Sequence, residues 1–123
     1  GYKPLMDSKT LQALAVTAVE DGKAHDIKVI DVRGRTSIAD YMVLATGTSD
    51  RHCKSLADRV VDASKESGLR PLGVEGTEGG EWILVDLYDV LVHVMQPRVR
   101  DFYNLEKLWD VVAQRRGKTD GTD

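Results

Sequence analysis

The chain has 123 residues, enough for a single domain with its own hydrophobic core. Its composition, 41% hydrophobic and 30% charged, is typical of a soluble globular protein, and a formal net charge of −3 disfavours a general nucleic-acid binder. One cysteine, Cys53, excludes an internal disulfide, and since we find neither a secretory signal nor a membrane-length apolar run, we expect a cytoplasmic protein.

The first part of the chain predicts a helix followed by two strands. Apolar residues recur at helical spacing over 8–20, with Ser8 as the expected N-cap and Gly22 as the stop signal. Runs of strand-forming residues then lie over 26–32 and 41–46.

A second helix is predicted over 51–67, directly after the turn Thr-Gly-Thr-Ser at 46–49. This turn could hold an anion on backbone amides, but no lysine follows the glycine, and Asp50 adds a negative charge. We therefore interpret Ser49 as an N-cap. Cys53 lies on the apolar face of this helix and is expected to be a small buried hydrophobe.

The remainder of the chain predicts three strands and a last helix. The strands lie over 72–76, 81–87 and 89–95, and their short connections favour antiparallel pairing. Pro97 opens the helix. The apolar face of this helix carries Val99, Phe102, Leu105, Trp109, Val112 and Ala113.

The order α-β-β-α-β-β-β-α predicts an α+β domain with a mixed sheet of about five strands packed by helices. We expect the domain to cover 8–114, with an extension over 1–7 that could derive from cloning and a flexible polar tail over 115–123. The basic residues of the C-terminal region are expected to be solvated: Arg98, Arg100, Arg115 and Arg116.

The two strands from 81 to 95 carry two unlike faces. One face is apolar and is predicted to pack on helices: Ile83, Val85, Leu87, Val90, Val92 and Val94. The other mixes apolar and ionisable side chains: Trp82, Leu84, Asp86, Asp89, Leu91, His93 and Met95. A two-residue turn at Leu87 and Tyr88 would place Asp86 opposite Asp89. Because facing carboxylates repel, we expect a cation, a partner's basic side chain or a solvated turn beside them.

This mixed face is a candidate surface for a basic protein partner. Trp82 and Leu84 would form its apolar anchor, and the acids, which we expect to gather around Trp82, would meet Lys or Arg. The candidate partner-binding residues are Glu75, Trp82, Leu84, Asp86, Tyr88, Asp89 and His93. Two alternatives remain open: Trp82 and Leu84 could be core residues beneath a helix, and the aspartates could cap backbone amides in the turn.

The sequence shows no clear catalytic or metal-binding pattern. A nucleotidyltransferase would carry an Asp-x-Asp pair after its Gly-Ser turn, and the helix over 51–67 has none. His52 and Cys53 are adjacent and so point in different directions, and His25 and His93 have no zinc-ligand spacing to Cys53. We expect a protein that is not an enzyme and binds no metal or cofactor. The alternative is a nucleotidyltransferase-like enzyme or nucleotide-binding protein.

Four blocks of the chain resemble the ribosomal silencing factor family, also called Iojap-like proteins. They are SIADYMVLATGTSDRH at 37–52, GVEG at 73–76, the two strands over 81–95, and YNLEKLW at 103–109. The resemblance implies a translation repressor that binds large-subunit ribosomal protein L-fourteen and sterically blocks joining of the small subunit when nutrients are short. It also implies a fold like that of nucleotidyltransferases, without their catalytic acids. We expect no DNA or membrane partner, and a homodimer through the exposed hairpin is a further hypothesis.

Overall fold

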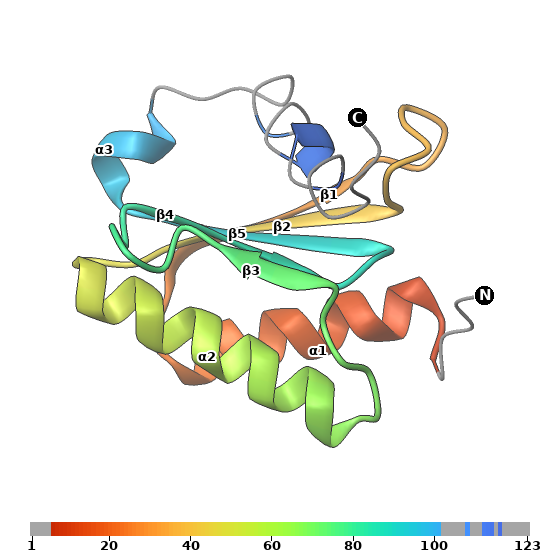
Figure 1. Ribbon diagram of the computed structural model, residues 1–123, viewed down its shortest axis with the longest axis horizontal. Coiled ribbons are helices and arrows are strands. Elements are labelled where there is room, and N and C mark those ends of the chain that lie inside the picture. The colour runs from red at the N-terminus through yellow and green to blue at the C-terminus, as the bar shows by residue number, and fades with distance from the viewer. Residues whose placement is uncertain (1–5, 102–107, 109–111, 115, 117–123) are drawn as a thin grey trace.

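The computed structural model of the chain describes residues 6–101, 108, 112–114 and 116. Its fold is a five-stranded mixed sheet with helices, so the predicted α+β class and element order are confirmed (Figure 1). The elements are α1 (Ser8–Asp21), β1 (His25–Asp31), β2 (Tyr41–Thr46), α2 (Asp50–Glu66), β3 (Gly73–Glu75), β4 (Trp82–Asp86), β5 (Val90–Met95) and α3 (Pro97–Arg100). Among the described residues, no helix combines the length and the apolar character that crossing a bilayer requires.

The strand order in the sheet is β1-β2-β5-β4-β3. β2 and β5 pair in parallel, and the other neighbouring strands pair antiparallel, as predicted for the last three strands. Every residue of the two central strands, β2 and β5, is buried. In this strand order, β1 and β3 form the two edges of the sheet.

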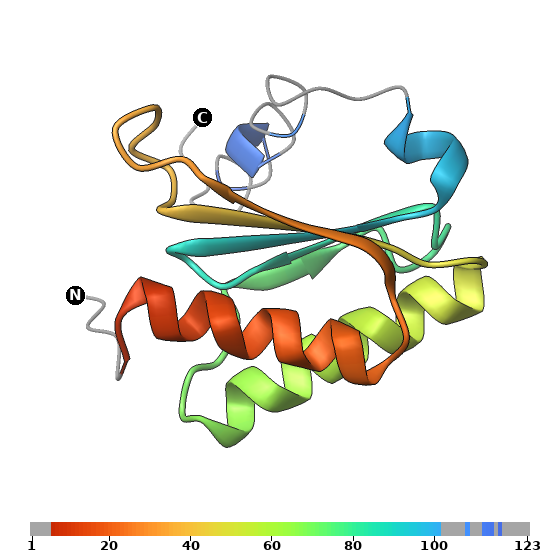
Figure 2. The same cartoon turned by 180° about the vertical axis from the view of Figure 1, so that it is seen from behind.

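Helices α1 and α2 cover one face of the sheet (Figures 1 and 2). The apolar face predicted for the β4–β5 hairpin packs there, in one cluster with Leu11 and Ala15 of α1 and Leu56 and Val60 of α2. All six of its residues have no exposed surface, which confirms this part of the prediction. Burial of such side chains is the main driving force for folding.

The ends of the two long helices are set by local hydrogen bonds. The N-cap of α1 is Asp7, whose carboxylate accepts the Thr10 N–H at 2.8 Å, so the prediction of Ser8 is wrong. Ser8 is already helical, and its hydroxyl donates to Asp40 instead, at 2.6 Å. The predicted end of α1 at Gly22 is confirmed.

The start of α2 agrees with its prediction. Ser49 is the N-cap, and its hydroxyl accepts the His52 N–H at 3.0 Å. Cys53 is fully buried, as expected, and burial raises the pKa of its thiol. Gly47 packs so closely on this residue that an added Cβ would lie 2.7 Å from the Cys53 sulfur.

The opposite face of the sheet is covered by α3 and by described residues of the C-terminal region (Figure 2). Leu108 and Val112 are buried there in a second apolar cluster, together with Leu84 and Leu91. Ala113, predicted on the apolar face, is exposed. The predicted helical positions Phe102, Leu105 and Trp109 lie outside the described residues.

Candidate functional site

The β4–β5 hairpin turns one residue later than predicted. Asp86 lies opposite Leu91 rather than Asp89, so the predicted pair of facing carboxylates is wrong. The turn residues are Tyr88 and Asp89, and Tyr88 has a φ of 69°, in the left-handed region. The Asp86 carboxylate accepts the Tyr88 N–H at 2.9 Å, which supports this unusual turn. Because the register differs by two positions, the side chains of the two strands still lie on their predicted faces, whereas Asp89, predicted on the mixed face, is a turn residue.

The candidate partner-binding residues lie in two groups and do not gather around Trp82 as predicted. Trp82 begins β4, whereas Tyr88 and Asp89 follow its other end. Tyr88 follows Trp82 by six positions, which at about 3.3 Å per residue separates the two by up to about 20 Å. Glu75 lies between these groups, opposite Leu84. We call the two regions the Trp82 end, around Trp82 and its pocket, and the Asp86 end, around Asp86 and the turn.

At the Trp82 end, the indole makes a hydrogen bond inside the protein. Nε1–H of Trp82 donates to Nδ1 of His93 at 2.9 Å, with the ring centroids 5.8 Å apart and the ring planes tilted by 44°. His93 is fully buried, and this burial lowers its pKa to about 3, so the imidazole is neutral at physiological pH. Since Nδ1 is the acceptor, the ring proton lies on Nε2, which has no hydrogen-bond partner among the described residues.

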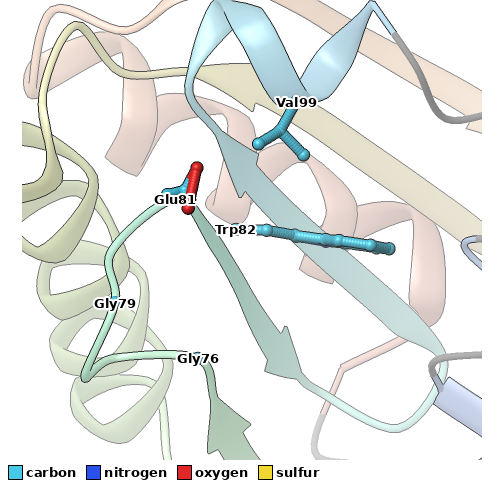
Figure 3. A pocket seen from close by; sticks show the side chains of 5 residues that line it. All are labelled: Gly76, Gly79, Glu81, Trp82 and Val99. Atoms are coloured by element: carbon cyan, nitrogen blue, oxygen red, sulfur yellow. The ribbon is translucent and has the colours of Figure 1, made fainter.

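A pocket of about 350 Å³ lies beside this indole (Figure 3). It is lined by Gly76, Gly79, Glu81, Trp82 and Val99. The Trp82 and Val99 side chains form its apolar part, and the loop between β3 and β4 forms the other part. Glu81 forms an ion pair with Arg98 at the surface. Gly76 has a φ of 90°, and an added Cβ would lie 2.1 Å from the Trp82 carbonyl oxygen, so the loop needs glycine here.

At the Asp86 end, the expected cation is the protein's own Arg116. Asp86 is fully buried, and its two carboxylate oxygens accept Nε–H and Nη2–H of Arg116 at 3.0 and 2.9 Å. The same guanidinium donates to the carbonyl oxygens of Ile38 and Tyr88, each at 2.8 Å. The prediction that Arg116 is a solvated residue of a loose tail is therefore wrong.

Two further carboxyl groups lie near this ion pair. Burial raises the pKa of Asp89, the Asp40 carboxylate raises it further, and Arg116 acts in the opposite direction. The backbone N–H of Asp40 donates to the Asp89 carbonyl at 2.8 Å.

Within the described residues, no group of His, Cys, Asp or Glu side chains is arranged to hold a metal ion.

The other predicted surface arginines behave differently from one another. Arg98 is exposed, as expected. Arg100 is half-buried and donates to the Thr46 hydroxyl at 2.7 Å and to the Asp26 carbonyl, so it ties α3 to the neighbouring strand ends. Arg115 lies outside the described residues.

Burial divides the candidate residues into two classes. Leu84 is 1% exposed, and Asp86 and His93 are 0% exposed, so none of these three can touch a partner directly in this conformation. For Leu84 the core alternative is correct, and Asp86 caps the turn amide, as its alternative proposed. The candidates with surface available are Glu75, Trp82, Tyr88 and Asp89.

Sequence reasoning missed Arg116. A carboxylate on an otherwise apolar strand face signals a buried counter-ion, because an unpaired buried charge is costly. The pattern therefore predicts a cation near Asp86, but it does not identify which basic residue supplies it, because Arg116 lies 30 positions away in the sequence.

Comparison with known proteins identifies a family. The family described as "Ribosomal silencing factor during starvation" matches residues 6–122. A protein of Chromobacterium violaceum named Ribosomal silencing factor RsfS is 47% identical over 104 residues, covering 85% of each chain. Its namesake in Bacillus subtilis is 38% identical over 104 residues, 85% of this chain and 88% of that protein. A crystal structure of a Chromobacterium violaceum protein matches with a TM-score of 0.80 at 47% identity, over 85% of this chain and 88% of that one.

Proposed function

This chain belongs to the ribosomal silencing factor family, and we propose that it binds large-subunit ribosomal protein L-fourteen and blocks the joining of the two ribosomal subunits when nutrients are short. The observation that carries this proposal is the family match over residues 6–122. The mechanism is steric occlusion, in which a bound protein occupies space that the small subunit needs. It requires no catalytic step, and we place it in the cytoplasm.

We propose that the contact surface includes Glu75, Trp82, Tyr88 and Asp89. Trp82 is half-buried and lines the pocket together with Val99, and Glu75 is exposed on the edge strand β3. Tryptophan and tyrosine are frequent energetic centres of protein interfaces, and carboxylates at the rim favour a basic partner. The net charge of −3 suits an approach to the ribosome through one of its basic proteins.

Sedimentation of the protein with separated ribosomal subunits tests the proposed function. We expect it to migrate with the large subunit and to reduce the fraction of joined ribosomes when both subunits are present. Migration with the small subunit alone, or subunit joining at its normal level, contradicts the proposal.

The contact surface is tested separately by binding to isolated L-fourteen. Trp82→Ala should raise Kd by at least about tenfold, as expected for a central aromatic residue. Val29→Ala is the matched control, because Val29 is 39% exposed on β1 at the opposite edge of the sheet. Similarly, Glu75→Lys should weaken binding, and Glu66→Lys, the same charge change on α2, should not. Equal Kd values for variants and controls would refute this surface.

A further inference from the structure

Trp82 and His93 are joined by the hydrogen bond from indole Nε1–H to imidazole Nδ1, at 2.9 Å. An indole has one hydrogen-bond donor and no acceptor. Its polar atom is therefore directed into the protein, and what the ring adds to the pocket is its apolar surface. Figure 3 shows this ring beside Val99, on the side of the sheet that carries α3.

His93 is a buried acceptor for this bond. It lies on β5, a central strand paired with β2 on one side and β4 on the other, and it is 0% exposed. Burial lowers its pKa to about 3, so the ring is neutral at physiological pH, and Nδ1 is its unprotonated nitrogen because it accepts the indole N–H. The imidazole is therefore enclosed in the protein with Nδ1 as its acceptor.

A histidine at this position also has a cost. Its Nε2–H is buried and has no hydrogen-bond partner among the described residues. An unpaired buried donor is unfavourable, and the surroundings include Leu84, Leu91 and Met95, where an apolar side chain would pack without that cost. Among the described residues, the contact that distinguishes histidine from leucine here is the bond to Trp82.

We propose that His93 is a positioning residue for partner binding, because it holds the Trp82 indole in the orientation that forms one side of the pocket. The partner then meets a pre-oriented aromatic face rather than a free N–H donor. Binding is stronger when a contact residue is already ordered, since less conformational entropy is lost on association. This inference rests on the proposed function, in which Trp82 contacts the ribosomal partner.

A double-mutant cycle on binding to isolated L-fourteen tests the inference. His93→Leu removes the acceptor, and Trp82→Phe removes the donor from the partly exposed side of the bond. Each substitution should raise Kd, and the Kd of His93→Leu should be about five- to tenfold higher than that of the unmodified protein. The double variant should bind no more weakly than Trp82→Phe, because the two residues act through one bond.

Two further measurements separate positioning from a general effect on the fold. His93→Asn retains an acceptor near the Nδ1 position and should stay within about twofold of the original Kd. In nitrogen-edited NMR spectra, the Trp82 indole N–H signal, assigned with a Trp109→Phe variant, should move and exchange faster in His93→Leu but not in His93→Asn.

The possible outcomes distinguish this inference from the proposed function. If Trp82→Ala weakens binding but Trp82→Phe and His93→Leu do not, the positioning role is refuted and the contact surface stands. Additive losses in the double variant also refute it. If the unmodified protein does not bind L-fourteen, the proposed function and this inference both fail. Should His93→Leu not fold, unchanged binding by Trp82→Phe still refutes the positioning role, because this variant lacks the same bond.

Discussion

Mild acid should destabilise this protein through His93. The imidazole is fully buried, and burial lowers its pKa to about 3 from the ordinary value of 6.5. Between these two values, the unfolded chain binds a proton that the folded chain does not, so the free energy of unfolding falls as the pH falls. The contribution of His93 is thus fully present above pH 6.5 and is lost progressively toward pH 3.

The size of this effect follows from the difference between the two pKa values. Each pH unit inside the interval corresponds to about 1.4 kcal/mol. Between pH 7.5 and pH 5, the free energy of unfolding should therefore fall by about 2 kcal/mol from this group alone. For a domain of this size, that is a considerable part of the ordinary total of about 5–15 kcal/mol.

Urea unfolding followed by circular dichroism measures this loss. The unmodified protein is compared with His93→Asn at pH 7.5, 6 and 5, because both proteins contain the same other titrating groups. The difference between their free energies of unfolding should shift by about 2 kcal/mol across this range, in favour of the variant at pH 5. Parallel pH dependences would show that His93 does not titrate in this way and would refute the reasoning.

Three other substitutions test the structure around the site. Arg116→Ala leaves the buried Asp86 carboxylate unpaired and should lower the free energy of unfolding by about 3–5 kcal/mol. Arg98→Ala, which removes an exposed ion pair, should lower it by at most about 1 kcal/mol. Similar losses for the two variants in urea unfolding would argue against a buried pair. Gly76→Ala should lower the free energy of unfolding by about 2 kcal/mol or more, because its Cβ would meet the Trp82 carbonyl oxygen. Gly79→Ala should leave stability unchanged, because a Cβ there has open space. Equal melting temperatures for the two variants would contradict this. Ser49→Ala removes the N-cap of α2 and should lower the free energy of unfolding by about 1 kcal/mol, whereas Ser49→Asp should retain stability. An unchanged unfolding midpoint in the alanine variant would show that the cap does not stabilise the helix.

The features of this fold that the sequence predicts are those that depend on local pattern. Alternation along β4 and β5 assigned each side chain to its face, and that assignment survived an error in the turn. The turn itself was misplaced because Tyr88 adopts a left-handed backbone conformation that a large side chain seldom takes. It is supported by the Asp86 side chain, which preference rules for single turn residues do not include.

The errors at the candidate site are long-range. Arg116 and Asp86 are 30 residues apart. Sequence pattern can show that a buried carboxylate or histidine needs a partner, but the fold decides which side chain arrives. The same limit explains why Leu84 was predicted at the surface. Leu84 is buried in one cluster with Leu108 and Val112, and the local sequence does not show that the C-terminal segment packs on this face of the sheet.

The ion pair of Asp86 with Arg116 also changes which charges a partner can meet. Asp86 is buried and paired with a cation, so it adds little to the surface potential, and the exposed acidic residues on the Trp82 side of the hairpin are Glu75, Glu78 and Glu81. An interface of ordinary size buries about 800 Å² on each partner, a patch roughly 30 Å across. Such a patch is wide enough to include the Trp82 end and the turn about 20 Å away. We therefore propose that one partner meets both ends, with the Trp82 pocket supplying affinity at the first and Tyr88 and Asp89 forming the rim at the second.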